Sequence, residues 1–453
     1  MDVAYFSPMP PAKTGIAHYS AMLVPALREQ VKVEVVDSPA AIVAQNAVRI
    51  YHLGNNPHHE WIYLEALKTP GIVVLHDVVL HHLIVEMTLA RGDAEAYAQA
   101  LRTNHGAAGE AWARGRAAGL HSEMGNFLFP ASIELASRSL GVIVHNNWAK
   151  DLLLSFGVTT PIHVVPHPSV RSKVSGGRPS KKIAGVFGFL TSAKRGEVIL
   201  EAAEKAGIEM LIVGEAAPNI DASRFKTTGY VSDKEFEQYY AQVDRLVNLR
   251  YPSAGETSGT LIRTFQIGKP IAVSDYAQFA EYPDDIVVKI PLGEGEVDAL
   301  ADFFRRDFDY DAVAAAQRAW VDANARLDQT VAGYVDALER RTPSSASRAS
   351  SAATPLFPVL EVVAQDQGKL TLKNLGPPIK THVYGDPSYR LIAKLFDGAT
   401  EIADRWIELP RDLATGEETT VEIPHRAGAT LRLYHALEGI PMLEPEAWHA
   451  AAL

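Results

Sequence analysis

The sequence of 453 residues contains no cysteine. This absence excludes a disulfide framework, a thiolate nucleophile and a zinc site built on cysteine ligands. No apolar run is long enough to span a bilayer. The first predicted strand, Val3–Phe6, leaves no room for a signal peptide. We therefore expect a cytoplasmic protein, and peripheral contact with the inner face of a membrane stays open.

Positive charge is scarce relative to negative charge. The formal net charge of −11 argues against broad nucleic-acid binding. Hydrophobic residues make up 47% and charged residues 21% of the chain, which is typical of a globular protein. The chain is too long for one ordinary core, so we expect two or three domains.

Short β-branched runs alternate with helical patterns over the first ~310 residues, which predicts parallel sheets covered by helices. The first set of expected strands comprises Val3–Phe6, Val31–Val36, Val48–Tyr51, Ile72–Leu75, Gly141–Val144 and His163–Val165. A second set comprises Ile183–Phe187, Met210–Val213, Arg245–Leu249, Pro270–Val273 and Ile286–Ile290. Two doubly wound α/β domains of this kind usually bind ligands in the cleft between them, at the carboxyl ends of the strands.

Composition changes after the second α/β set. Residues 342–356 include a run of small and polar residues bounded by prolines, which predicts a flexible linker. Short alternating runs follow it, such as Tyr389–Phe396 and Thr430–His435, and these predict an antiparallel β-sandwich. The expected domains are residues 1–168 (Rossmann-like), 169–311 (Rossmann-like), 312–341 (closing helices), 342–356 (linker) and 357–453 (β-sandwich).

Residues 255–270 carry the most informative motif. A strand-like run leads into a turn that places Glu256 just before a helix. Gly255, Ser258 and Gly259 let backbone N–H groups face a ligand, and the helix N-terminus favours negative charge there. A carboxylate beside such an anion cradle suits a ligand with phosphate and hydroxyl groups, for example a nucleotide-sugar. An ordinary strand–turn–helix is the alternative.

Two basic residues, Lys194 and Arg195, directly precede another predicted helix. Cations are unfavourable at a helix N-terminus unless an anion joins them, so the pair predicts a diphosphate site. A solvated basic turn is the alternative. Gly15, at the first strand-to-helix junction, allows a phosphate to approach the backbone, although such loops are also common without a ligand. Lys13 and His18 in that loop are either cleft or surface residues.

Three histidines, His76, His81 and His82, follow the predicted strand Ile72–Leu75. A histidine at the carboxyl end of a parallel strand lies at the cleft edge, where it can donate to a ligand hydroxyl. With Asp77 the three could hold a metal, but His81 and His82 would point about 100° apart on a helix, which disfavours this. We expect His81 and His82 to line an acceptor pocket, with ordinary helix surface as the alternative.

In their order along the chain, these motifs resemble those of the family 4 retaining glycosyltransferases of the GT-B fold, over about residues 1–340. The Gly15 loop is similar to the family's loop beneath the donor diphosphate. His76 matches the histidine near the donor sugar, and Lys194 matches the lysine that neutralises the diphosphate. Glu256 matches the first acid of the Glu-x7-Glu motif.

Further segments of the chain are similar to the same family. Val213-Gly214 and Thr228–Tyr230 resemble the strand end and the loop that flank the nucleotide base, and Gly268–Pro270 and Phe279–Glu281 resemble the loops after the Glu-x7-Glu helix. The motifs and the resemblance together assign a catalytic pair, His76 and Glu256. The assigned donor-binding residues are Gly15, Lys194, Arg195, Gly214, Arg250, Thr257, Ser258 and Gly259.

Two departures from the family pattern stand out. Phe189 occupies the usual position of an arginine, whose charge Arg195 would supply instead. The second acid of the Glu-x7-Glu motif is replaced by Thr264, beside Arg263, which puts recognition of the ribose in doubt. These changes fit a divergent branch and also an inactive member of the family.

The resemblance implies a retaining, metal-independent transferase without a cofactor. It would move a sugar from a UDP- or GDP-linked donor to a glycan, a lipid-linked molecule or another hydroxyl acceptor. The leaving phosphate would deprotonate the acceptor, and the domains would close about the segment Ser169–Lys181. We expect the polar helical segment Arg91–Phe129 to shape the acceptor pocket, with a structural insertion as the alternative.

Other functions stay open. A non-catalytic glycan- or nucleotide-binding GT-B protein is one alternative, and a nucleotide-sugar epimerase is another. A phosphorylase is disfavoured because no segment suits a pyridoxal phosphate lysine. The β domain resembles immunoglobulin-like modules appended to bacterial enzymes and transporters of polysaccharides. It would hold a growing glycan, a partner or a second copy of this chain, or serve only as a structural appendage.

Overall fold

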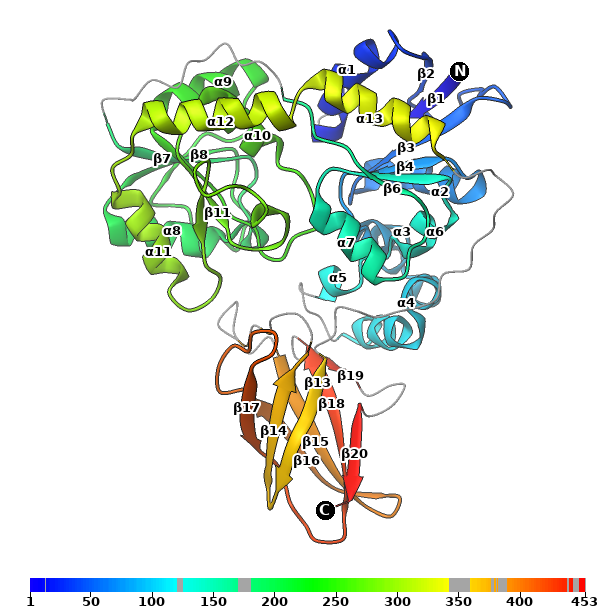
Figure 1. Ribbon diagram of the computed structural model, residues 1–453, viewed down its shortest axis with the longest axis vertical. Helices are drawn as coiled ribbons and strands as arrows, with labels where there is room; N and C mark the ends of the chain where they lie inside the picture. Colours follow the sequence, from blue (N-terminus) through cyan, green and yellow to red (C-terminus); the bar gives the residue numbers. More distant parts are fainter. Residues whose placement is uncertain are drawn as a thin grey trace.

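The computed structural model describes residues 1–12, 14–119, 125–169, 181–341, 359–375, 379, 381, 389–437, 440–442 and 448–452. Two α/β lobes lie side by side, and a β-sandwich lies below them in the view of Figure 1. The expected linker at 342–356 and most of the expected hinge at 169–181 fall outside the described residues, and so does Lys13.

The N-terminal lobe is a parallel six-stranded sheet in the order β2-β1-β3-β4-β5-β6. Its strands are β1 (Asp2–Phe6), β2 (Lys32–Val36), β3 (Val48–Leu53), β4 (Ile72–Leu75), β5 (Gly141–Val144) and β6 (Ile162–Val164). The central strands β4 and β5 are entirely buried, which explains their purely apolar or small side chains. The covering helices are α1 (Gly15–Leu27), α2 (Glu60–Lys68), α3 (His81–Met87), α4 (Ala94–Ala117), α5 (Gly125–Leu128), α6 (Ile133–Arg138) and α7 (Asn147–Ser155).

The second lobe repeats this plan with a parallel sheet in the order β12-β11-β10-β7-β8-β9. Its strands are β7 (Ile183–Phe187), β8 (Glu209–Val213), β9 (Lys226–Thr227), β10 (Arg245–Asn248), β11 (Ile271–Ser274) and β12 (Val288–Ile290). The helices are α8 (Gly196–Ala206), α9 (Asp233–Gln242), α10 (Gly259–Ile267) and α11 (Glu296–Arg305). Separate apolar clusters fill the two faces of the sheet, so both faces are covered, as a parallel sheet requires.

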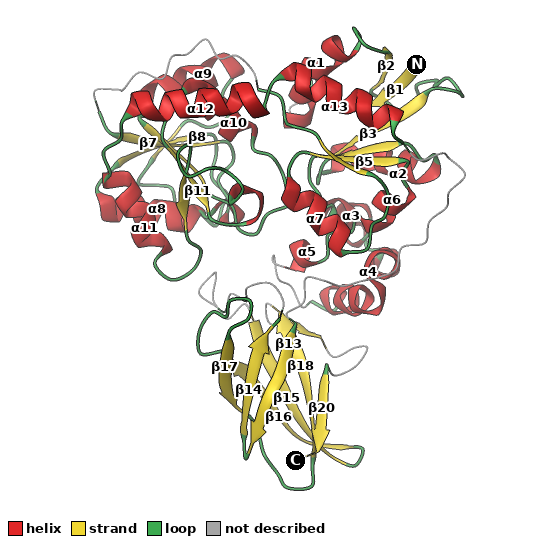
Figure 2. Ribbon diagram, in the orientation of Figure 1, coloured by secondary structure: helices red, strands yellow, loops and turns green. Residues whose placement is uncertain are grey.

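The expected closing helices are two, α12 (Tyr310–Asn324) and α13 (Leu327–Glu339). Helix α12 packs on α10 of the second lobe, whereas α13 crosses to the N-terminal lobe and packs on α1 and β5 (Figures 1 and 2). The Tyr334 hydroxyl of α13 lies 3.0 Å from that of Tyr19 in α1. The chain therefore begins and completes the N-terminal lobe from distant parts of the sequence.

The C-terminal domain contains two antiparallel sheets. One has the order β13-β14-β17, and the other has the order β16-β15-β18-β19 with β20 also paired to β18. Their strands are β13 (Leu360–Asp366), β14 (Lys369–Asn374), β15 (Tyr389–Asp397), β16 (Thr400–Glu408), β17 (Glu418–Glu422), β18 (Thr430–Leu437), β19 (Ile440–Met442) and β20 (His449–Ala452). Leucines from both sheets, such as Leu370, Leu391 and Leu431, share one core, so the predicted sandwich is confirmed.

The predicted α/β strands are all present, with ends shifted by a few residues, and the two Rossmann-like domains are confirmed. Sequence patterns missed β9, β13, β19 and β20. Strand β9 has only two residues, both exposed, β13 is largely exposed, and β20 has no buried residue, so neither length nor alternation marked them. No helix in the described part of the chain combines the length and the apolar character that a membrane crossing requires.

Docking of α13 on the N-terminal lobe depends on a close contact at Gly333. A Cβ at this position would lie 2.7 Å from Cγ1 of Val165. We expect Gly333→Val to destabilise the protein by about 1–3 kcal/mol through overpacking. The exposed neighbour Ala332 provides a matched control, because Ala332→Val adds a β-branched side chain to the same helix without this contact. Equal thermal stability of the two variants would contradict the packing role of Gly333.

Candidate functional site

A cleft of about 1840 Å³ separates the two lobes, and residues of both lobes line it. The N-terminal lobe contributes the loop before α1 and the ends of β4 and β5. The second lobe contributes the ends of β7 and β8, the loop before α9 and the first turn of α10. Among the predicted site residues, those that line the cleft are Gly15, His18, His76, Gly214, Glu256, Thr257 and Gly259. The carboxyl ends of two parallel sheets thus face each other, as the sequence predicts.

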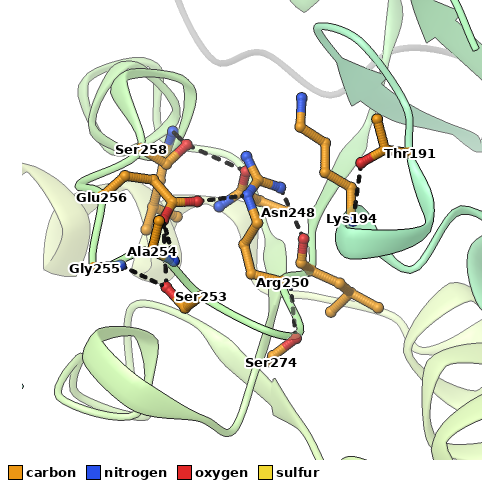
Figure 3. Close-up of polar contacts among 12 residues, drawn as sticks. Thr191, Lys194, Asn248, Arg250, Ser253, Ala254, Gly255, Glu256, Ser258 and Ser274 are labelled. Atoms are coloured by element: carbon orange, nitrogen blue, oxygen red, sulfur yellow. Dashed lines mark hydrogen bonds and ion pairs between the residues drawn. The ribbon is translucent and has the colours of Figure 1, made fainter. Parts of the chain in front are cut away.

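Glu256 belongs to a hydrogen-bonded network at the end of β10 (Figure 3). Its Oε1 accepts from Arg250 Nε at 3.0 Å, and its Oε2 accepts from the amide of Ala254 at 3.1 Å and from Ser253 Oγ at 3.3 Å. The Arg250 amide in turn donates to Ser274 Oγ at 2.9 Å. Contacts from side chain and backbone therefore fix the Glu256 carboxylate at the edge of the cleft.

Helix α10 starts directly after this network. Ser258 is its N-cap, with its Oγ accepting from the amide of Leu261 at 3.3 Å and donating to Asn248 Oδ1 at 3.2 Å. Ser258 is buried, whereas Thr257 and Gly259 line the cleft. The N–H groups of the first helical turn lack intrahelical partners, and the helix dipole adds partial positive charge, so this end of α10 suits an anion.

Lys194 lies on the opposite side of Arg250 from Glu256 in the view of Figure 3. Its Nζ is 3.4 Å from where a Cβ would stand at Gly188, a cleft residue at the end of β7. Burial, together with the Arg250 charge, lowers the pKa of Lys194 to about 7, although Glu256 opposes the shift. No ion-pair partner for this ammonium group occurs among the described residues. An anionic ligand would restore its full positive charge.

Close approach of two strand ends shapes the floor of the cleft near Lys194. Gly214, at the end of β8, has φ +140°, and a Cβ there would lie 2.6 Å from the carbonyl oxygen of Gly188. Only glycine fits this conformation and spacing. The resulting backbone surface has no side chains, so a ligand could lie directly against it.

His76 lies at the base of a group of aromatic and imidazole rings around Tyr19. Its Nε2 is 3.0 Å from Nδ1 of His52, and its ring makes an edge contact with Tyr19 at 4.6 Å between centroids. His145 and His167 also border Tyr19, at 5.3 Å and 5.1 Å. Burial, with the neighbouring histidines, lowers the pKa of His76 well below its usual value. His76 is thus a neutral hydrogen-bonding group at pH 7, not a cation.

Arg195 does not join the other predicted donor residues. Its guanidinium group is buried and binds the buried carboxylate of Glu296, with Nε 2.9 Å from Oε1. This ion pair connects the residue before α8 with the start of α11, and neither residue is among those that line the cleft. The sequence could not show this because Glu296 lies far away along the chain.

The two histidines expected at the acceptor pocket do not line the cleft. His81 is buried, with Nδ1 2.6 Å from the carbonyl oxygen of Phe129 and Nε2 2.6 Å from the Tyr97 hydroxyl. His82 lies between amide groups, 2.8 Å from Asn55 and 3.2 Å from Asn126. Both histidines hold α3 against its neighbours, so their role is structural.

Some cleft residues were noted in the sequence but not assigned to the site. Phe189, at the position of the family's arginine, and Tyr230, in the loop compared with the base-flanking one, are 50% and 70% exposed and line the cleft. Arg263 lines the same part of the cleft, with its guanidinium carbon 5.5 Å from the ring centre of Phe236. The position of Arg263 one turn after Gly259 on α10 was available in the sequence, because residues four apart share a helix face.

Asp77 also lines the cleft, and the sequence had suggested it only as part of a metal cluster. Its Oδ2 accepts from the amide of Asn55 at 2.8 Å. Burial, with repulsion from Glu256, raises the pKa of Asp77 to about 7. The carboxyl groups of Asp77 and Glu256 belong to different lobes but lie close enough to repel each other. No group of three or more acidic, histidine or cysteine side chains in the described residues is arranged to hold a metal.

The raised pKa of Asp77 predicts a specific pH dependence of stability. Between about pH 4 and pH 7 the unfolded chain has released the Asp77 proton while the folded chain still holds it, so stability falls as pH rises through this window. Asp77→Asn removes this effect and can keep the hydrogen bond from Asn55. We therefore expect the melting temperature of Asp77→Asn relative to wild type to rise from pH 4 to pH 8. Asp285→Asn, at an exposed position, should show no such trend; a pH-independent difference for Asp77→Asn would contradict the account.

Sequence comparison identifies no relative of this chain. No protein-family model matches the sequence, and no curated protein sequence matches it.

Comparison of structures does find similar proteins. The chain is similar to the Anabaena protein HepE in complex with UDP-glucose, with a TM-score of 0.51 and 12% identity over 75% of this chain and 99% of that chain. It is also similar to sucrose-phosphate synthase from Thermosynechococcus elongatus, with a TM-score of 0.50 and 13% identity over 75% of this chain and 98% of that chain. The two lobes and the cleft between them therefore have the GT-B fold.

Proposed function

We propose that this chain is a retaining glycosyltransferase that moves a sugar from a UDP- or GDP-linked donor to a hydroxyl group of a glycan, lipid-linked or other acceptor. The observation that carries the proposal is the meeting of Lys194, Arg250 and Glu256 near the start of α10, where Glu256 lines the interlobe cleft. The fold likeness to HepE, whose structure contains UDP-glucose, supports it.

The donor diphosphate would lie against the glycine-lined floor of the second lobe. Lys194, the amide of Thr257 before the helix and the first N–H groups of α10, which begin at Gly259, would neutralise the charge that develops on the leaving nucleotide. We propose that these groups make a divalent metal unnecessary. Arg195 has no part in this arrangement because Glu296 holds its charge in the interior.

The sugar would lie between the lobes. Glu256 would accept hydrogen bonds from its hydroxyl groups, and the neutral His76 would hydrogen-bond near the reactive carbon. In the transfer step the bond from the anomeric carbon to the diphosphate oxygen breaks. The bond from that carbon to the acceptor oxygen forms, and the acceptor proton passes to the leaving phosphate. The buried surroundings of His76 exclude water from one side of this reaction.

A second candidate is a non-catalytic protein that binds a nucleotide or a glycan in the same cleft. It is favoured by Phe189 and Thr264 at positions where related enzymes carry an arginine and an acid, and by the sequestered Arg195. Turnover separates the candidates, since a binding protein would be stabilised by a nucleotide-sugar without consuming it. An epimerase would convert the nucleotide-sugar in the absence of an acceptor.

Binding of the donor should depend on the protonation of Lys194. Because its pKa is about 7 without a ligand, binding of a diphosphate takes up a proton above that pH, and affinity should fall as pH rises from 7 to 9. UDP-glucose is a suitable probe because its diphosphate does not titrate in this range. Calorimetry should show this fall in wild type and a flatter profile in Lys194→Arg, which stays charged. The same measurement on Asp77→Asn shows how much of the pH dependence of affinity comes from the Asp77 carboxyl group.

Removing the Lys194 ammonium should weaken donor binding at neutral pH. We expect Lys194→Ala to lose ~1.5–3 kcal/mol of binding free energy, or about 10- to 150-fold in affinity. An unchanged affinity, or a pH profile identical in wild type and Lys194→Arg, would show that the diphosphate does not contact Lys194.

The Glu256 carboxylate should affect transfer more than nucleotide binding. Screening UDP- and GDP-sugars by thermal stabilisation identifies the donor, and release of the nucleotide in the presence of acceptors then measures turnover, with and without EDTA. We expect Glu256→Gln to lower kcat by ~100-fold or more, with little change in the affinity for the free nucleotide. Glu201→Gln, at an exposed position of α8, is the matched control. Full activity of Glu256→Gln would refute its role, and loss of activity with EDTA would refute metal independence.

A further inference from the structure

The loop that carries Glu256 is bound directly to the other lobe. The carbonyl oxygen of Ala254 accepts from the amides of Val78 at 2.7 Å and Val79 at 3.2 Å, just after His76 and Asp77. The amide of Ala254, on the same residue, donates to the Glu256 carboxylate. A single buried residue of the second lobe therefore contacts both the N-terminal lobe and the proposed sugar-binding carboxylate.

The N-terminus of α7 makes a second connection to this loop. Asn146 is the N-cap of α7, and its Oδ1 accepts from the amide of Ala149 at 2.8 Å. Its Nδ2 donates across the lobe boundary to the carbonyl oxygen of Gly255 at 2.8 Å. The two ends of one side-chain amide thus have separate functions, since one caps a helix and the other binds the loop before Glu256.

The second lobe contributes a carboxylate to the same helix end. Glu281 Oε1 accepts from the amide of Trp148 at 2.5 Å, and its Oε2 accepts from the amide of Asn147 at 3.2 Å. These amides have no partners within the helix, and negative charge is favourable at this position. In Figure 1, α7 lies on the side of the N-terminal lobe that faces the second lobe.

Side-chain packing leaves no space around Gly255. A Cβ there would lie 2.7 Å from Val78 Cγ1 and 3.1 Å from Trp148 Cζ3, and the residue has φ +82°. Glycine is therefore required both for the backbone conformation and for the close contact between the lobes.

We propose that Asn146 and Glu281 are positioning residues for sugar transfer, which hold the Glu256 loop in place through contacts between the lobes. We call Asn146, Glu281 and the N-terminus of α7 the interlobe latch. The inference rests on the proposed function in that Glu256 orients the donor sugar. Because the partners belong to different lobes, a rotation that widens the cleft breaks the latch and frees the Glu256 loop. Glu256 then keeps its contacts with Arg250, Ser253 and Ala254 but loses the support of the other lobe, which limits donor hydrolysis in an open cleft.

The test uses variants that separate helix capping from the latch. Asn146→Asp keeps an N-cap acceptor for α7 but removes the donor to Gly255, and Glu281→Ala removes the carboxylate from the helix end. Gln266→Ala is the matched control, because Gln266 Nε2 donates to Ser169 Oγ at 2.9 Å, a polar contact between α10 and the segment after β6 that does not involve the Glu256 loop. Amide hydrogen exchange of residues 250–258, kcat, donor KM and UDP affinity are measured for the full-length chain.

We expect faster exchange of residues 250–258 in Asn146→Asp and Glu281→Ala, with unchanged UDP affinity and a kcat lowered about 10- to 100-fold. Gln266→Ala should match wild type. Wild-type exchange of this segment in both latch variants would overturn the proposal, and so would faster exchange with undiminished kcat. If wild type itself transferred no sugar, the proposed function would fail, whereas the exchange data would still decide whether these residues hold the loop.

Discussion

The electrostatic coupling of Lys194, Arg250 and Glu256 is the interaction on which the rest of the site depends. Burial, together with the neighbouring Arg250 charge, lowers the pKa of Lys194 to about 7, and the Glu256 carboxylate beside the two cations opposes this shift. Such a group is costly without a counter-ion and favourable once an anion binds. Of the three residues, Glu256 lines the cleft, and Lys194 lies behind Gly188, a glycine of the cleft lining at the end of β7.

The two lobes contribute groups of different electrostatic character. The second lobe supplies fixed charges and a helix N-terminus, which suit a diphosphate. The N-terminal lobe supplies rings, with His76 and its neighbouring histidines held neutral by burial around Tyr19, together with Asp77, whose pKa is raised to about 7. A sugar between these surfaces would meet neutral hydrogen-bonding groups on one side and charge on the other. The contacts of Ala254 with Val78 and Val79 make the two surfaces a single site.

The sequence predicted the fold well because parallel strands buried on both faces are marked by continuous apolar runs, such as Ile72–Leu75. It also predicted residues in the connections that follow strands, because topology alone places them at the cleft: His76 comes directly after β4, and Glu256 lies in the turn between β10 and α10. The sequence could not predict in which direction a long side chain points or which residue it binds. Arg195 is adjacent to Lys194 in sequence but binds Glu296 in the interior, and His81 binds Phe129 and Tyr97 instead of lining the cleft. These partners lie between 16 and 101 residues away along the chain, and nothing in the local sequence marks them.

A crystal structure of the protein with bound UDP-glucose tests the central claim most directly. The account predicts that the diphosphate lies within hydrogen-bonding distance of Lys194 Nζ and of the first N–H groups of α10, with the glucose hydroxyls toward Glu256 and His76. A nucleotide bound elsewhere on the second lobe, or a diphosphate without contact to Lys194, would contradict it.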